Sequence, residues 1–280
     1  MNSALRSEVS EVVSFKRGPE RIVCLTEETV EWLYLLGEQE RIVGISGFAM
    51  RPPEARRDKP KVSLFTDAKI DAIKELKPDL VIAFSDIQAD IARDLISEGL
   101  NVWCTNQRSI PEIFETLLQL ASMVDCRSKG IELLETWKAK LGKWQENAAQ
   151  HSLRPRVYFE EWPDPMMTTI RWVSELIEIV GGDDIFREQS FSSLAKGRIV
   201  SNQDILDARP ELYIGSWCGK KVKFQDVKVR HGWHELPCIK DGQLFEINST
   251  IILQPGPAAI LDGVDVLGRL VGAWRDQKCA

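Results

Sequence analysis

The chain has 280 residues, of which 44% are hydrophobic and 28% charged, as in globular proteins that bury a sizeable core, and its length favours two domains. Its net charge of −6 and the lack of a long basic run argue against a nucleic-acid-binding surface. No stretch approaches the roughly 18 consecutive apolar residues of a membrane-spanning helix, which argues against membrane insertion.

Residues 1–20 are predicted to form a polar N-terminal segment that precedes the first lobe. Glu8 and Glu11 interrupt any apolar run of signal-peptide length, and no lipid-attachment cysteine follows such a run. We therefore expect a cytoplasmic location, or a periplasmic one if the sequence begins after a removed signal. Six scattered cysteines without CxxC spacing are expected to be reduced, which suits the cytoplasm.

The first half alternates strands with helices, which predicts an α/β lobe with a parallel sheet over residues 21–124. Glycines at 37 and 99 directly follow two of the helices, where glycine is the usual C-terminal cap. The apolar runs predict strands at 21–25, 42–46, 80–84 and 100–104, and helices at 27–37, 69–76, 87–98 and 110–124.

A long helix is predicted between the halves, over residues 125–151. Ile131, Leu134, Trp137, Leu141 and Trp144 recur at spacings of three and four, which places them on one apolar stripe. A second α/β lobe is expected over 152–280. Its predicted strands are 156–160, 212–216 and 243–247, and its predicted helices are 171–182 and 256–275.

The two halves carry similar phrases. IKELKPDLVI at 73–82 and ILDARPELYI at 205–214 each read as a helix end, a proline and a buried parallel strand. Internal similarity at a long offset suggests duplication, and therefore two Rossmann-like lobes of one architecture.

At this level the chain resembles a known family. RIVCLTEETVEWLYLLGEQERIVGIS, LKPDLVIAFSDIQADIARDLISEGLNVW and EEWPDPMMTTIRWVSELIEIVGGDDIF are similar to the cobalamin and iron-siderophore substrate-binding proteins of ABC transporters. The third segment fits the cobalamin-binding branch of this family better than the siderophore-binding branch. The resemblance covers residues 21–274 and implies two α/β lobes bridged by one helix, with a ligand in the interlobe cleft.

The resemblance also implies docking onto a membrane permease through one acidic residue per lobe. The first position matches Asp71, whereas the second is Gln203, with Asp204 adjacent. One docking charge is therefore absent or displaced. A cytoplasmic corrinoid or tetrapyrrole carrier or sensor without a permease is a second hypothesis.

Ligands of parallel α/β sheets bind beyond the carboxyl ends of the strands, which selects particular loops. Aromatic walls with a few polar groups suit a large planar chelate such as cobalamin. Residues 160–172 hold several prolines and are expected to form a long loop over the ligand or a lid without contact. The ligand-binding candidates are Glu27, Phe48, Phe65, Ser85, Glu161, Trp162, Trp172, Trp217, Cys218, Trp233, Ser249 and Gln254.

His231 and His234 are candidates for an axial metal ligand, because imidazole is a good ligand for cobalt and iron. The alternative is that both are exposed loop residues beside Trp233. Cys218 is a further metal-ligand candidate, although its spacing to His231 matches no zinc motif.

Catalysis is not indicated. The sequence contains no GxSxG, P-loop, HExxH or strand-linked GxGxxG motif. Glu160 and Glu161 are adjacent on a predicted strand and would point to opposite faces. We predict a binding protein without a catalytic cofactor, and a metal-dependent enzyme on the same fold is the weaker alternative.

Overall fold

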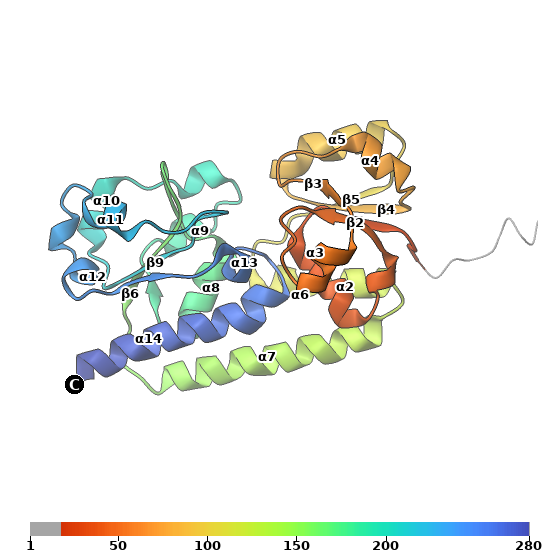
Figure 1. The fold of residues 1–280 in the computed structure, drawn as a ribbon. Coiled ribbons are helices and arrows are strands. Elements are labelled where there is room, and N and C mark those ends of the chain that lie inside the picture. The colour runs from red at the N-terminus through yellow and green to blue at the C-terminus, as the bar shows by residue number, and fades with distance from the viewer. Residues whose placement is uncertain (1–17, 280) are drawn as a thin grey trace, which may run out of the picture.

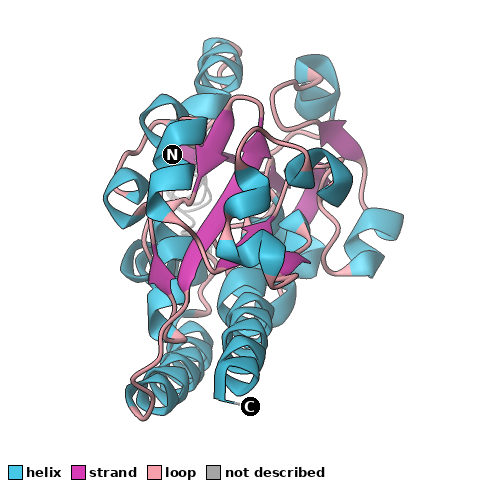
Figure 2. Ribbon diagram, turned by 90° about the vertical axis from the view of Figure 1, so that its left-hand side faces the viewer, coloured by secondary structure: helices cyan, strands magenta, loops and turns pink. Residues whose placement is uncertain are grey.

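The computed structural model describes residues 18–279 as two α/β lobes side by side, joined along one edge by a long helix (Figure 1). Each lobe is built around its own sheet, with helices on both sides of the strands (Figure 2). The predicted fold class is therefore confirmed.

The N-terminal lobe contains a five-stranded parallel sheet in the order β3-β2-β1-β4-β5. Apolar residues on one face pack under α2 and α6, and those on the other face pack under α4 and α5. The strands are β1 (Ile22–Cys24), β2 (Ile42–Ser46), β3 (Lys61–Ser63), β4 (Leu80–Phe84) and β5 (Val102–Thr105), and the helices are α2 (Glu27–Leu36), α3 (Pro53–Asp58), α4 (Ile70–Glu75), α5 (Ala89–Ser97) and α6 (Ile110–Met123).

The C-terminal lobe has the strand order β10-β9-β6-β7, with β8 beside β6. Its sheet is parallel except for β7, which runs antiparallel to β6. The strands are β6 (Arg156–Pro163), β7 (Met166–Thr168), β8 (Asp183–Asp184), β9 (Leu212–Gly215) and β10 (Leu244–Glu246), and the helices are α8 (Arg171–Ile179), α9 (Arg187–Ser190), α10 (Asn202–Ala208), α11 (Phe224–Lys228), α12 (Pro237–Lys240) and α13 (Ser249–Ile252).

The connecting helix α7 (Arg127–Ala149) underlies both lobes, and α14 (Val264–Cys279) lies alongside it (Figure 1). Trp137 of α7 packs edge-on against Trp32 of the N-terminal lobe, with ring centroids 5.3 Å apart. Toward the other end, Lys140 and Trp144 both donate to the carboxylate of Asp265 in α14, at 2.7 and 3.0 Å. The predicted apolar stripe therefore packs against the lobes at Leu134, Trp137, Leu141 and Trp144, whereas Ile131 is 43% exposed.

The repeated phrases correspond to matching pieces of backbone. In the first lobe α4 leads to β4, and in the second α10 leads to β9. The residue before each proline adopts a left-handed conformation, with φ of 48° at Lys77 and 46° at Arg209. The strands that follow occupy the same place, because β4 pairs with β1 and β9 pairs with β6 in parallel register.

One local prediction is wrong. Residues 160–172 do not form a long loop, because β6 continues to Pro163 and folds back as the antiparallel hairpin β6–β7. The predicted final helix is present. It begins at Pro257, passes through a π-helical turn at 259–263 and continues as α14 from Val264. Within residues 18–279, no helix combines the length and apolar character that crossing a membrane requires.

Candidate functional site

A cleft of about 650 Å³ opens between the lobes, a volume typical of a small-molecule site. The N-terminal lobe contributes the segment after β2 and one side chain of α3, and the C-terminal lobe contributes the loop after β9 and the start of α13. Both walls therefore lie near the carboxyl ends of parallel strands, as the sheet topology predicts. The lining residues are Gly47, Phe48, Met50, Arg56, Gly219, Lys220, Lys221, Glu246, Asn248, Ser249 and Thr250.

The cleft combines apolar and polar groups. Phe48 and Met50 are 46% and 44% exposed, so the N-terminal wall presents apolar surface to the cleft. Opposite them, the hydroxyl of Ser249 accepts a hydrogen bond from the Gly219 backbone N–H at 3.4 Å. A ligand between these walls would meet apolar surface on one side and hydroxyl and amide groups on the other.

Glu27 borders the cleft at the first turn of α2. Its carboxylate is nearly buried and accepts a long hydrogen bond of 3.5 Å from the Met50 backbone N–H. Burial raises the pKa of Glu27 to about 8, and it raises the pKa of the neighbouring Glu28 to about 7. One oxygen of Glu28, Oε2, is buried without a hydrogen-bond partner.

Glu161 and Cys218 lie on the C-terminal side of the cleft. Glu161 forms an ion pair with the buried Arg198. The pKa of the Cys218 thiol is raised, chiefly by burial and then by Glu161 and Glu27. Of these two acids, Glu27 belongs to the N-terminal lobe. The raised thiol pKa is the reverse of what a metal-binding or nucleophilic thiolate needs.

Glu160 lies beneath the cleft in a buried cluster. Its carboxylate is fully buried and accepts five hydrogen bonds, two of them from Arg230 at 2.6 and 3.0 Å. The others come from the Trp217 indole N–H and from the hydroxyls of Tyr158 and Tyr213, each at 2.9 Å. Glu160 and Glu161 therefore face opposite sides of β6, as predicted, and Glu160 fixes the start of the loop that carries Lys220 and Lys221.

Several contacts hold the lobes in one arrangement. The Glu175 carboxylate of α8 accepts a hydrogen bond from the Ile110 backbone N–H at the start of α6, at 2.7 Å. Arg51 of the N-terminal lobe forms an ion pair with Asp262 at 2.6 Å. Gly256 also packs against Glu28, because a Cβ placed at Gly256 would lie 2.4 Å from the Glu28 Cβ.

The predicted tryptophans do not share one location. Trp162, on the β6–β7 hairpin, is partly exposed and carries the Lys220 ammonium 3.6 Å from its ring centroid. Trp217 is directed inward to Glu160. Trp172 and Trp233 are buried in the core, where Trp172 donates to the Ile252 carbonyl and Trp233 to the Asn202 side chain. The prediction of ligand contact is therefore corrected for Trp172, Trp217 and Trp233, because their rings complete the core.

The histidine prediction is also corrected. His231 and His234 are exposed and flank Trp233, close to α11 and α12 at the end of the lobe distant from the N-terminal lobe (Figure 1). His234 is paired with Glu235 at 3.5 Å. Neither lines the cleft, which is what the loop alternative predicts. Among residues 18–279, no group of three or more His, Cys, Asp or Glu residues is arranged to hold a metal ion.

The other candidates have local roles. Ser85 adopts φ 57° and accepts a hydrogen bond from the Ile87 backbone N–H, so its hydroxyl stabilises a turn. The Phe65 carbonyl accepts from the Gln88 side chain at 3.0 Å. Gln254 begins the turn that brings Gly256 against Glu28. Of the twelve ligand candidates, Phe48 and Ser249 line the cleft, and Glu27, Glu161, Trp162 and Cys218 border it.

Sequence reasoning missed the cationic residues of the cleft. Lys220 and Lys221 follow Cys218 after Gly219, so the strand-end rule reaches them if the loop is followed three residues further. Arg56 lies on α3, a short helix that carries no such signal.

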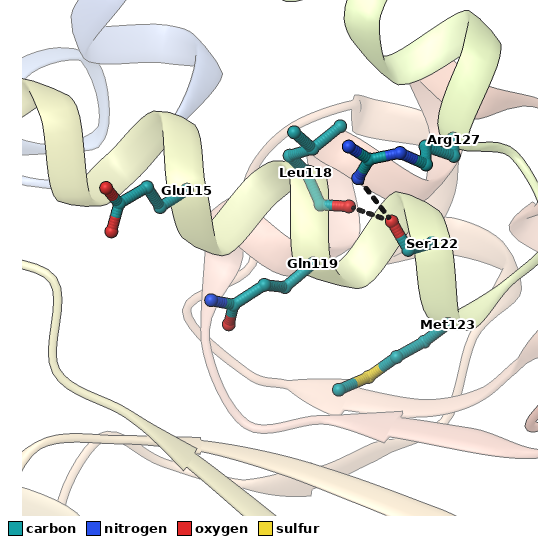
Figure 3. A pocket seen from close by; sticks show the side chains of 6 residues that line it. All are labelled: Glu115, Leu118, Gln119, Ser122, Met123 and Arg127. Atoms are coloured by element: carbon teal, nitrogen blue, oxygen red, sulfur yellow. Dashed lines mark hydrogen bonds between the residues drawn. The ribbon is translucent and has the colours of Figure 1, made fainter.

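A second recess lies at the junction of α6 and α7, outside the cleft (Figure 3). Two of its polar side chains, Ser122 and Arg127, are hydrogen-bonded to each other. Arg127 donates to the Ser122 hydroxyl, which donates to the Leu118 carbonyl at 2.7 Å. This recess belongs to one lobe, and it lacks the facing walls of the interlobe cleft.

The family model described as periplasmic binding protein matches residues 22–251. The chain belongs to the periplasmic binding protein family. Members of this family bind solutes rather than transform them, so the protein is a solute-binding protein and not an enzyme, as the sequence predicted.

Relatives of this periplasmic binding protein support the assignment. It is 24% identical to an uncharacterised ABC transporter substrate-binding lipoprotein, YvrC of Bacillus subtilis, over 92% of this chain and 82% of the relative. It is also 24% identical to a vitamin B12-binding protein of Vibrio parahaemolyticus, over 86% of each chain. A heme-binding protein, RhuT from Roseiflexus, has the same fold, with a TM-score of 0.76, 19% identity and coverage of 91% of this chain and 100% of that one.

The predicted docking positions of this binding protein lie on the side opposite α7, on α4 and α10 (Figure 1). Asp71 is exposed in the first turn of α4. Asp204 is held within α10, where it accepts hydrogen bonds from the backbone N–H and the hydroxyl of Ser201 at 2.8 and 2.7 Å. Gln203 is exposed and donates to Asp207 at 2.8 Å.

Proposed function

We propose that this protein binds a cobalamin-type corrinoid, or a similar large metal chelate, between its lobes, as the substrate-binding component of an ABC importer. The observation that carries the proposal is the cleft itself, whose apolar and polar walls come from different lobes. The vitamin B12-binding relative supports the corrinoid, and the substrate-binding lipoprotein supports the transport role.

The two walls suit different parts of such a ligand. Phe48 and Met50 offer apolar surface to the face of a planar ring. Asn248, Ser249 and Thr250 offer hydrogen-bonding groups to amide substituents at its edge. No described side chain in the lining is a histidine, so recognition rests on the ring and its periphery rather than on an axial ligand.

Titration with cobalamin tests the proposal, followed by calorimetry and visible absorbance. Phe48→Ala should weaken binding roughly tenfold to a hundredfold, because it removes the burial of a phenylalanine ring. Phe191→Ala is the matched control. Phe191 is similarly exposed, at 50%, but lies outside the cleft against Arg171 and Arg187. If no corrinoid or related chelate binds, or if the two variants weaken binding equally, the proposed site is wrong.

A second candidate is a corrinoid or tetrapyrrole carrier or sensor without a permease. The observation that favours it is the α10 docking position, where Gln203 is neutral and the Asp204 carboxylate is bound to Ser201. Uptake assays in cells that express the candidate permease with and without this protein separate the two. If Asp71→Ala and Gln203→Ala leave uptake unchanged, docking at these positions is wrong.

The compartment stays a prediction. The cytoplasmic expectation was drawn from the first 20 residues, of which residues 1–17 lie outside the described part of the chain. The lipoprotein relative supports a location outside the cytoplasm. Fractionation of cells that express the native gene, with detection by antibody, decides between the two.

A further inference from the structure

We propose that the ligand is anionic at its edge, and that its carboxylate or phosphate groups bind Arg56, Lys220 and Lys221. This inference rests on the proposed function and specifies the charge of the chelate. The three cations line one cleft but come from different lobes, Arg56 from α3 and the two lysines from the loop after β9.

These cations differ from the other charged groups near the cleft. Among residues 18–279, none of the three forms an ion pair with a carboxylate. Arg56 donates to the Gly47 carbonyl, and Lys220 lies over the Trp162 ring. The arginines nearby do have acidic partners, in the pairs Arg51–Glu31, Arg108–Asp86, Arg198–Glu161 and Arg230–Glu160.

The acidic groups at the cleft do not neutralise this charge. Glu246 is the only described carboxylate in the lining, and it accepts a hydrogen bond from the Val222 backbone N–H at 3.1 Å. Glu161 is committed to Arg198. Glu27 is mostly uncharged at neutral pH, because burial raises its pKa to about 8. The cleft is therefore positive although the whole chain carries a net charge of −6.

The apolar part of the wall further restricts the class of ligand that fits the cleft. A small inorganic anion would leave Phe48 and Met50 exposed. A ring that carries acidic substituents covers these side chains with its face and reaches the cations with its edge. The chemical class is therefore an amphipathic metal chelate with peripheral carboxylates or a phosphodiester.

Two matched pairs of ligands test the charge and distinguish its source. Iron protoporphyrin carries two propionates, and its dimethyl ester keeps the ring and metal but loses both charges. Cobalamin carries a phosphodiester in its nucleotide loop, and cobinamide lacks this whole loop, so the variants below are needed to assign a preference within this pair to charge. For at least one pair, the wild-type protein should bind the anionic member roughly tenfold more tightly, as expected for charged hydrogen bonds, and the preference should diminish as salt is raised.

Variants connect the preference to these residues. The double variant Lys220→Gln, Lys221→Gln and the single variant Arg56→Gln should reduce the preference and leave affinity for the uncharged member nearly unchanged. Lys228→Gln is the control, since Lys228 is an exposed lysine of α11 outside the lining. Equal affinity of the wild-type protein for both members of each pair overturns this inference and leaves the proposed function standing. Failure to bind any of the four chelates overturns both.

Discussion

Arg51 and Asp262 join the two lobes through an ion pair in which Arg51 Nη2 lies 2.6 Å from Asp262 Oδ2. The same guanidinium donates through Nε to Glu31 of α2 at 2.9 Å. Asp262 lies in the π-helical turn that precedes α14, so one arginine of the N-terminal lobe connects α2 to the base of the C-terminal lobe. The contact links the N-terminal lobe to the segment that leads into α14.

Replacing Arg51 by methionine should lower the free energy of unfolding by about 1–2 kcal/mol, because the largely buried Glu31 loses a charged hydrogen bond while the exposed pair with Asp262 contributes little. Arg57→Met is the control, since Arg57 and Asp58 form an exposed pair. Urea unfolding measures both. Equal effects of the two substitutions would show that the pair of Arg51 with the buried Glu31 adds nothing to stability.

Glu160→Gln should lower the free energy of unfolding by about 3–5 kcal/mol, because it leaves the Arg230 guanidinium partly buried without a counter-charge. Two tyrosine hydroxyls and one indole N–H also lose a charged acceptor. Glu235→Gln, at an exposed pair with Lys240, is the control and should leave stability nearly unchanged. A loss below about 1 kcal/mol in Glu160→Gln would contradict the role of the buried cluster.

Stability should fall as pH rises from about 4.5 to about 8. The folded-state pKa of Glu27 is about 8 and that of Glu28 about 7, both above the ordinary value of 4.5. The folded protein therefore binds more protons than the unfolded chain in this window, and their contribution is full below pH 4.5 and lost above the folded pKa. Glu27→Gln should flatten the slope by up to about 1.4 kcal/mol per pH unit. Urea unfolding at several pH values tests this, and an unchanged slope in the variant contradicts it.

Gly256→Ala should destabilise the protein and widen the interlobe contact, because the added Cβ would lie 2.4 Å from the Glu28 Cβ. Gly272→Ala is expected to have the opposite effect on stability. Nothing lies within 4 Å of a Cβ at Gly272, which is in the interior of α14, so alanine should stabilise the helix by about 0.5–1 kcal/mol. Thermal unfolding of both variants checks the signs, and a stabilised Gly256→Ala would show that the lobes are not in close contact there.

The fold was readable because its main elements depend on local patterns. The apolar runs ending near residues 25, 46 and 84 became β1, β2 and β4, and the repeated proline phrases became equivalent helix–strand units. The β6–β7 hairpin was missed, because the prolines at 163 and 165 are typical of a loop, and only the pairing of residues 160–163 with residues 166–168 shows the strands.

The residues of the candidate site could be predicted only in part from the sequence. The strand-end rule located Phe48 and Ser249, since it depends on sheet direction alone. The rule cannot tell whether a side chain after a strand turns toward the cleft or into the lobe. Trp217 follows β9 as predicted, yet its indole turns inward, because the buried Glu160 carboxylate offers it an acceptor. That acceptor is 57 residues away along the chain.

The long helix α7 limits how this protein can respond to what it binds. At 23 residues it extends about 35 Å and underlies both lobes, so a clamshell motion would have to bend a continuous helix. The ligand must therefore enter and leave through a cleft that is already open. The radius of gyration in solution should hardly differ between the ligand-free and the ligand-bound protein. Any receptor that discriminates between these two forms must therefore contact the ligand itself or detect small shifts at the edge of the cleft.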